Sequence, residues 1–358
     1  MMSYIAKRLA LIPLTLLLIM AVNFAIVQTA PGGPVELVMS RLRSAAPGQT
    51  LSVGGGGGGD TASGSVYRGG QGLEEEARAR LTRQFGFDKP LGQRFWLMMK
   101  AYAAFDFGES FYRNRRVIDL IWDKLPVSAS LGILSTLLVY LIAIPLGIAK
   151  AVRAGTAFDK WTSAAVVAAY AVPSFLLAIF LVVLLAGGSY LSWFPLKGLT
   201  SDNFAELSAW GRLCDWLWHL ALPVASLAVG GIASLAWLTR GAFLEELGKT
   251  YVAAATAKGI SRARVLWGHV FRNAMLVVIA GFPSALVGML FTGSVLVEIV
   301  FSLDGLGLLG FTAVSTRDYP VIFGTLYMFT LLGLLLNLIS DLTYRLIDPR
   351  LDFKAVAS

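Results

Sequence analysis

Residues 127–149 read VSASLGILSTLLVYLIAIPLGIA, a run with no charged side chain between Lys124 and Lys150. About 20 apolar residues in a helix are enough to cross the ~30 Å hydrocarbon layer of a bilayer. Five further charge-free runs of at least this length occur along the chain. We therefore predict six membrane-spanning helices, near residues 9–29, 127–149, 162–186, 217–238, 274–297 and 321–344.

The composition indicates the same class of protein. Of the 358 residues, 56% are hydrophobic and 15% are charged, whereas a soluble domain has about 45–50% apolar and about 25% charged residues. One cysteine, Cys214, and two histidines, His219 and His269, are too few for a disulfide framework or a histidine-rich metal cluster. We expect an all-α polytopic membrane protein with no catalytic residue, no metal and no cofactor of its own.

Lysine and arginine are shared unevenly between the two sides of the predicted helices. With the N-terminus inside, the short inner segments carry fourteen of them, and the short outer loops carry only Lys197, Arg212 and Arg317. Basic residues gather on the cytoplasmic side of membrane proteins, so we expect both termini in the cytoplasm. The net charge of +8 then reflects topology and contact with lipid, not nucleic acid. The apolar run from Leu9 exceeds the roughly 7–15 residues of a signal-peptide core, so we expect it to remain as a span.

A long external segment separates the first two predicted spans. We divide the chain into residues 1–30 (the N-terminal tip and first span), 31–126 (the external segment) and 127–358 (the membrane core). Within the external segment, residues 74–84 and 91–104 have helical composition, and six consecutive glycines at 54–59 favour a flexible loop over a phosphate-binding one. The aromatic and methionine residues of 91–104 fit a local core, a rest on the membrane surface or a contact with a delivering protein.

The spans carry no group for driving transport. A proton-coupled carrier needs Asp, Glu or His within the hydrocarbon, but His219 lies near one end of a predicted span, and Glu298 and Asp341 lie at span ends. The chain also lacks the GxxxxGK[ST] motif of P-loop ATPases. Uphill transport would therefore need another polypeptide as its engine. A stand-alone carrier or channel and a non-transporting membrane scaffold are the alternatives.

The predicted cytoplasmic loop at about 240–273 is suited to receive such an engine. Residues 251–258 favour a helix, Gly259 is a natural left-handed helix end, and Ser261 can cap a following helix. The small residues Ala253, Ala254 and Ala255 allow close approach of another surface. The alternative is a helical surface loop that is basic only because it lies on the cytoplasmic side of the membrane.

At this loop the sequence resembles importer-type ABC transporter permeases of the oligopeptide and dipeptide family. The resemblance rests on Tyr251-Val252-Ala253-Ala254-Ala255, Ala257-Lys258-Gly259 and His269-Val-Phe-Arg272-Asn273, which look like the EAA loop of those permeases. Ala253 stands where the motif commonly has Glu, and Arg272 where it commonly has Pro. Further similar stretches include residues 30–34, 85–90, 106–110, 301–307, 317–320 and 348–350. Residues 68–73 and the long outer loop look closest to the Yej-type B subgroup, which is associated with peptide and microcin C uptake.

The resemblance implies partners and a mechanism. It implies a second, homologous permease, ATPase subunits that use ATP and Mg, and a periplasmic peptide-binding protein, all at the bacterial inner membrane. It also implies inward transport by alternating access, with the loop transmitting force from the ATPase. Polar residues that could line the pathway or bond between helices are Glu298, Asn337 and Asp341. Asn337 and Asp341 lie one helical turn apart and share a face.

Overall fold

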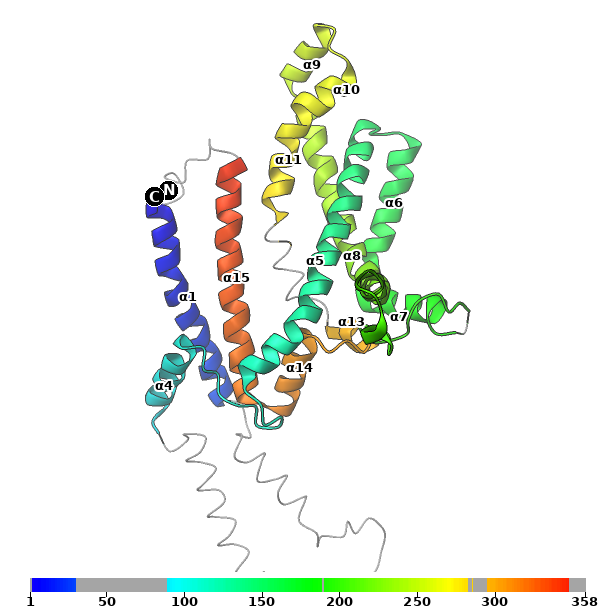
Figure 1. Ribbon diagram of the computed structural model, residues 1–358. Helices are drawn as coiled ribbons and strands as arrows, with labels where there is room; N and C mark the ends of the chain where they lie inside the picture. The colour runs from blue at the N-terminus through cyan, green and yellow to red at the C-terminus, as the bar shows by residue number, and fades with distance from the viewer. Residues whose placement is uncertain (1, 30–88, 189, 283–284, 286–294, 348–358) are drawn as a thin grey trace, which may run out of the picture. The chain divides into compact units, whose positions relative to one another are not determined.

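The computed structural model describes residues 2–29, 89–188, 190–282, 285 and 295–347, and all regular structure within them is helical (Figure 1). In these residues five helices are long and apolar enough to cross a membrane, or six if one bent pair is counted as a span. The predicted all-α polytopic fold is therefore confirmed. The predicted helix at 74–84 and the glycine run at 54–59 lie outside the described residues.

Four predicted spans lie inside long single helices. They are α1 (Met2–Thr29), α5 (Val117–Val152), α8 (Ala209–Leu247) and α15 (Tyr319–Ile347). The helices α5 and α8 extend well beyond the charge-free runs, since polar residues can continue a helix outside the hydrocarbon. Prolines inside α5 and α8 do not end these helices, because in a membrane bundle neighbouring groups can satisfy the freed backbone.

The predicted span at 162–186 is not one straight helix. It consists of α6 (Ala157–Ala171) and α7 (Ser174–Leu185), which are bent by 96° at the break between them. Pro173 lies in the break and has no N–H to bond to the preceding turn. It also forces Val172 out of the helical region, and Val172 is extended, with φ −85° and ψ 119°.

The predicted span at 274–297 begins earlier than expected. An apolar helical run extends from Arg262 to Ala280 through α10 (Arg262–Val265), the π-helical turn η2 (Leu266–Val270) and α11 (Phe271–Ala280). The basic residues at its start hid it from a search for charge-free runs. A short helix, α13 (Val295–Val300), follows, and most of the residues between α11 and α13 lie outside the described part.

The chain divides into two compact units, and the larger one is built around α8. This unit comprises residues 1–8, 119–312 and 328–358. Within it, α6, α7 and α11 all pack on α8. One buried cluster joins α5, α8 and α11 around Ala143, Ala236, Phe243 and Val278. The unit therefore has an apolar core along the C-terminal half of α8.

The smaller unit comprises residues 9–118 and 313–327 and includes α4 (Leu91–Ala103), which confirms the helix predicted at 91–104. The Tyr102 and Phe107 rings meet edge to face with their centroids 4.9 Å apart, and such a pair contributes about 0.5–1.5 kcal/mol beyond burial. The ring of Phe95 on α4 lies 5.5 Å from that of Phe24 on α1. The helix α4 therefore packs beside the C-terminal end of α1.

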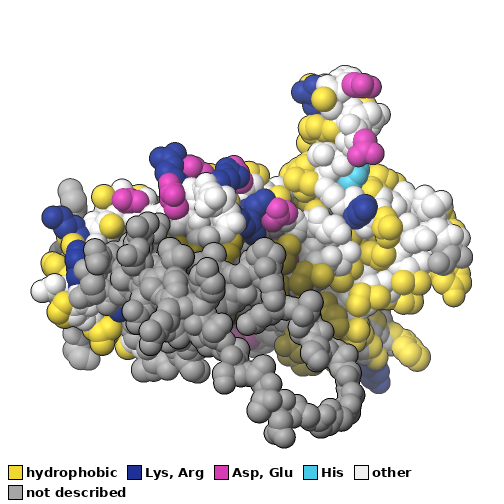
Figure 2. Space-filling view, turned by 90° about the horizontal axis from the view of Figure 1, so that it is seen from below, with side chains coloured by type: hydrophobic (Ala, Val, Ile, Leu, Met, Phe, Trp, Pro, Cys, Tyr) yellow, Lys and Arg dark blue, Asp and Glu magenta, His cyan; other side chains and the backbone are white. Residues whose placement is uncertain are grey.

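Large apolar side chains are exposed on the membrane helices. Leu141 on α5 is 73% exposed, and Phe180 on α7 is 60% exposed. Figure 2 shows hydrophobic side chains over a broad part of one face of the described surface. Such a surface is unfavourable in water but suits contact with lipid tails.

Candidate functional site

The predicted loop forms a compact helical hairpin at one end of α8. The chain leaves α8 at Leu247, forms α9 (Thr250–Ala257), turns at Gly259 and returns through α10 and η2 into α11. Figure 1 shows α9 and α10 projecting beyond the ends of α5 and α6. This loop is therefore available to a partner at that end of the larger unit.

The turn of the hairpin needs a glycine. Gly259 has φ +81°, in the left-handed region that side chains with a Cβ rarely adopt. Its N–H donates to Thr256 O at 3.0 Å, and the N–H of Ile260 donates to Ala255 O at 3.3 Å, which is the hydrogen-bond pattern of a Schellman motif. The predicted left-handed end of the helix is confirmed. Ser261 occupies the predicted N-cap position, but its side chain makes no capping hydrogen bond.

A buried carboxylate at the end of α8 holds the loop in place. Glu246, which is 6% exposed, accepts a hydrogen bond from the Tyr251 hydroxyl at 2.8 Å and another from Asn273 Nδ2 at 2.8 Å. Lys249 also donates to this carboxylate. The carboxylate therefore ties α8, α9 and α11 together. Tyr251 and Asn273 belong to the predicted loop motif, whereas Glu246, which brings them together, was not predicted.

The surroundings of Lys249 and Tyr251, two donors to Glu246, favour the protonated form of each side chain. The hydrogen bond to the Glu246 carboxylate raises the pKa of Lys249 above its usual value. Burial, followed by the hydrogen bond to the same carboxylate, raises the pKa of Tyr251. Both groups therefore keep their protons, and remain donors, at neutral pH.

The hairpin has two distinct faces. Tyr251, Val252, Ala255 and Asn273 belong to the inner side, where Val252 and Ala255 pack on the core cluster around α8 and the two polar residues bond to Glu246. The outer side of α9 exposes a second group, Ala253, Ala254, Ala257 and Lys258. His269 and Arg272 are also exposed, on η2 and α11. The hairpin therefore presents an outer face made mostly of small side chains, with its inner side fixed to α8.

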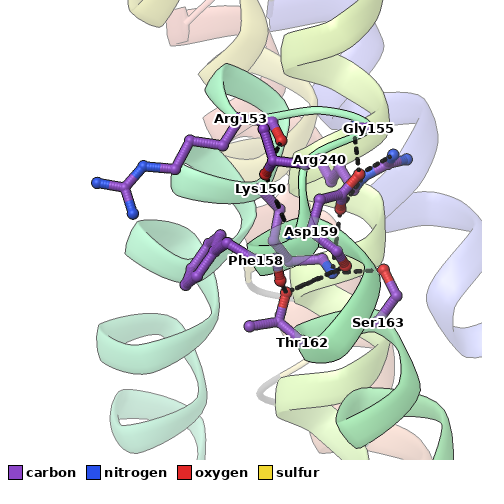
Figure 3. A network of polar contacts seen from close by, with 9 residues as sticks. Lys150, Arg153, Gly155, Phe158, Asp159, Thr162, Ser163 and Arg240 are labelled. Carbon is purple, nitrogen blue, oxygen red and sulfur yellow. Dashed lines mark hydrogen bonds and ion pairs between the residues drawn. The ribbon is translucent and has the colours of Figure 1, made fainter.

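A second charged cluster lies on α5, α6 and α8 near the same end of the unit (Figure 3). Arg240 on α8 donates from Nε to Asp159 Oδ1 at 2.9 Å and from Nη2 to Asp159 Oδ2 at 2.8 Å. The Lys150 ammonium on α5 lies 3.4 Å from Asp159 Oδ1. This cluster was not predicted, because its members are dispersed along the chain.

The polar residues predicted for the pathway have other contacts. Glu298 is fully buried, and its carboxylate accepts from the backbone N–H of Leu308 at 2.7 Å in the first turn of α14 (Leu306–Thr316). Asp341 pairs with Arg8 at 2.9 Å. Asn337 is exposed on α15. The geometry of Glu298 is that of a helix cap, which stabilises the start of α14.

Comparison with known proteins identifies the family to which this helical membrane protein belongs. Residues 143–353, more than half of the chain, match the model of the family described as "Binding-protein-dependent transport system inner membrane component". The chain belongs to this family. It is thus a permease subunit of an ABC transporter, a multi-span protein of the bacterial inner membrane, and in this family the ATPase is a separate subunit.

Several relatives match this permease over nearly its whole length. It is 53% identical to the "Peptidoglycan transport system permease protein YejB" of Agrobacterium fabrum, with 98% of each chain covered. It is 51% identical to the "Inner membrane ABC transporter permease protein YejB" of Escherichia coli O157:H7, with 98% of this chain and 99% of the relative covered. The "Dipeptide transport system permease protein DppB" of Escherichia coli K12 is 28% identical, with 99% of this chain and 100% of the relative covered.

The described residues contain no group of three or more His, Cys, Asp and Glu side chains that could hold a metal ion. The two carboxylates of the loop end, Glu246 and Asp159, are both occupied by donors from the chain itself.

Proposed function

We propose that this permease moves peptides or peptide-like compounds from the periplasm to the cytoplasm, and that ATP and Mg are used by partner ATPase subunits that bind the hairpin 249–273. The single observation that carries the proposal is the hairpin itself. Its inner side is fixed to α8 by Glu246, while its outer side exposes Ala253, Ala254 and Ala257. A rigid support with a small outer face can transmit force, because displacement of the face displaces the helices behind it.

The chemistry of the outer face favours a protein partner. Alanine side chains let another surface approach closely without losing side-chain entropy. Lys258 stands at the edge of this face and can pair with an acidic residue of a partner. We therefore place the ATPase contact on residues 251–259, and we assign His269 and Arg272 to its border.

The substrate class follows from the relatives. One relative is named for peptidoglycan transport and another for dipeptide transport. A substrate with a peptide backbone is common to both names, so we propose peptides, including the peptide parts of peptidoglycan fragments. Peptide antibiotics of the microcin C type belong to the same chemical class.

The remaining partners complete the proposed importer. We propose a heterodimer with a second, homologous permease and delivery by a periplasmic peptide-binding protein to the external segment at 31–126. The membrane core at 127–358 would form half of the pathway. Both termini and the hairpin would lie in the cytoplasm, in agreement with the distribution of Lys and Arg.

The test is to fill the outer face of the hairpin. Ala254→Trp adds a large side chain at an exposed position, so it should abolish co-purification of the ATPase and ATP-dependent peptide uptake in reconstituted vesicles. Ala209→Trp is the matched control, since Ala209 is an exposed alanine at the opposite end of α8. Normal ATPase binding and uptake with Ala254→Trp would reject the proposal. Uptake by the purified chain alone, without ATP, would favour a stand-alone carrier or channel.

A further inference from the structure

The carboxylate of Asp159 connects three helices of the larger unit. Asp159 is 4% exposed at the start of α6. It receives both guanidinium hydrogen bonds of Arg240 from α8, and the backbone N–H of Gly155 donates to its Oδ2 at 3.1 Å. Lys150 adds a contact from α5. One side chain therefore links α6 to α5 and α8, and Figure 3 shows these polar contacts.

The ammonium group of Lys150 has no exposure to solvent and is held entirely by α6. Its Nζ donates to Ser163 Oγ at 2.6 Å, to Thr162 Oγ1 at 3.0 Å and to Asp159 O at 3.2 Å. A buried charge is tolerated only when its hydrogen bonds are complete. Separation of α5 from α6 would leave this charge without partners, so the two helices are expected to move together.

The same region contains a close crossing of α5 and α8. A Cβ atom built on Gly147 would lie 2.6 Å from Thr239 Cβ and 2.8 Å from Ala236 O, so no side chain fits there. Gly147 is one helical turn before Lys150, and Thr239 directly precedes Arg240. The backbones thus touch where the charged cluster lies, which leaves little room for sliding between these helices.

The helix α8 joins this cluster to the anchor of the hairpin. Arg240 and Glu246 are six residues apart on one unbroken helix, which corresponds to about 9 Å along its axis. Glu246 holds the hairpin, and Arg240 holds Asp159. A displacement of α9 therefore passes to α8 through the Glu246 carboxylate. It passes from α8 to α5 and α6 through the Asp159 carboxylate.

From this arrangement we infer that Asp159 is a positioning residue that makes α5, α6 and α8 move as one rigid body when the hairpin is displaced. The inference rests on the proposed function, because it assumes that the hairpin is driven by an ATPase. Without the Asp159 carboxylate, the hairpin and α8 can follow the ATPase while α5 and α6 lag behind. ATP would then be hydrolysed without the matching movement of the pathway.

The first test measures coupling in the complete transporter. Asp159→Asn should raise the number of ATP molecules hydrolysed per peptide imported by about 5-fold or more, the lower end of typical coupling between sites. Asp215→Asn is the matched control, because the Asp215 carboxylate also fixes a segment to α8, accepting hydrogen bonds from Ser201 near the opposite end of that helix. Arg240→Gln added to Asp159→Asn should have little further effect, since both changes break the same contact.

The second test measures rigidity directly, in the unchanged protein and in the Asp159→Asn protein. Spin labels at Trp161→Cys on α6 and Glu245→Cys on α8, with Cys214→Ser, report the distance across the cluster. Both positions are exposed. The distance should be the same with and without a bound ATP analogue, and it should change with nucleotide in the Asp159→Asn protein.

The outcomes distinguish the role of Asp159 from the proposed function. A nucleotide-dependent distance in the otherwise unchanged protein, or an unchanged ratio of ATP to peptide in Asp159→Asn, overturns the role of Asp159 and leaves the proposed function intact. If Asp159→Asn does not insert, Asp159→Glu, which keeps the charge but lengthens the side chain, takes its place under the same criterion. Failure of the unchanged complex to couple ATP hydrolysis to uptake rejects the proposed function itself.

Discussion

A single substitution, Gly259→Val, tests whether the conformation of the hairpin turn matters for transport. No atom lies within 4 Å of a Cβ built on Gly259, so a side chain there meets open space and acts only through the backbone. At φ +81° the left-handed conformation costs about 1–2 kcal/mol for a residue with a Cβ, and a β-branched residue is worse. A cost of this size shifts the population of the native turn by about 5–30-fold.

We expect the Gly259→Val permease to insert normally and to lose peptide uptake together with stimulation of the partner ATPase. The assay is ATP hydrolysis and peptide uptake by the reconstituted complex at equal permease content. Gly188→Val is the matched control, because Gly188 also has positive φ, +70°, and open space around its Cβ, but lies after α7. Gly259→Asn should retain partial activity, since Asn tolerates this region. Normal uptake and ATPase stimulation with Gly259→Val would refute the reasoning.

Three further changes test the anchor, the cap of α14 and the surface of α4. Glu246→Ala removes the charged acceptor of the Tyr251 and Asn273 hydrogen bonds and should destabilise the complex by about 1–3 kcal/mol. Lys249→Ala should change the Tm of the complex little, because the Lys249 side chain is 49% exposed. Gly305→Ala places a Cβ 2.5 Å from the carboxyl carbon of Glu298, which caps α14, and should lower the free energy of unfolding by about 1–3 kcal/mol. Gly310→Ala is the control and should not destabilise the protein, because nothing lies within 4 Å of a Cβ there. Trp96 is 63% exposed on α4, and α4 packs beside the end of the α1 span. We therefore expect Trp96 to lie at the membrane surface, where a fluorophore attached to Trp96→Cys should be quenched by lipids that carry a nitroxide at the headgroup. Quenching by water-soluble agents alone would contradict this placement.

Sequence reasoning predicted the membrane helices well because hydrocarbon excludes charge, and that exclusion is visible residue by residue. It did not predict the bend at Pro173, since prolines at 145 and 223 lie inside continuous helices. Whether a proline ends a membrane helix depends on the groups packed around it, and those come from distant parts of the chain. The early start of the helix at Arg262 was missed for the related reason that basic residues can extend a helix beyond the lipid.

The candidate site likewise contains a feature that the sequence predicts and contacts that it does not. The turn at Gly259 was predictable because a left-handed helix end is a local property of the chain. The anchor was not, because Glu246 and Asn273 are 27 residues apart and meet only when α8 and α11 pack. Asp159 and Arg240 are separated by 81 residues. No local pattern distinguishes these carboxylates from the other acidic residues near helix ends.

The proposed path from hairpin to membrane helices can be told apart from a general loss of stability. Gly259, Glu246 and Asp159 stand at three successive points, namely the turn of the hairpin, its joint with α8 and the contact between α8 and its neighbours. A defect at the first point should remove ATPase stimulation and uptake together, because the contact surface itself is altered. A defect at the last point should leave ATPase stimulation while uptake falls, because the hairpin still moves. Instability alone would lower both activities in parallel at every position, so the order of phenotypes along the path is the feature that a mechanical connection requires.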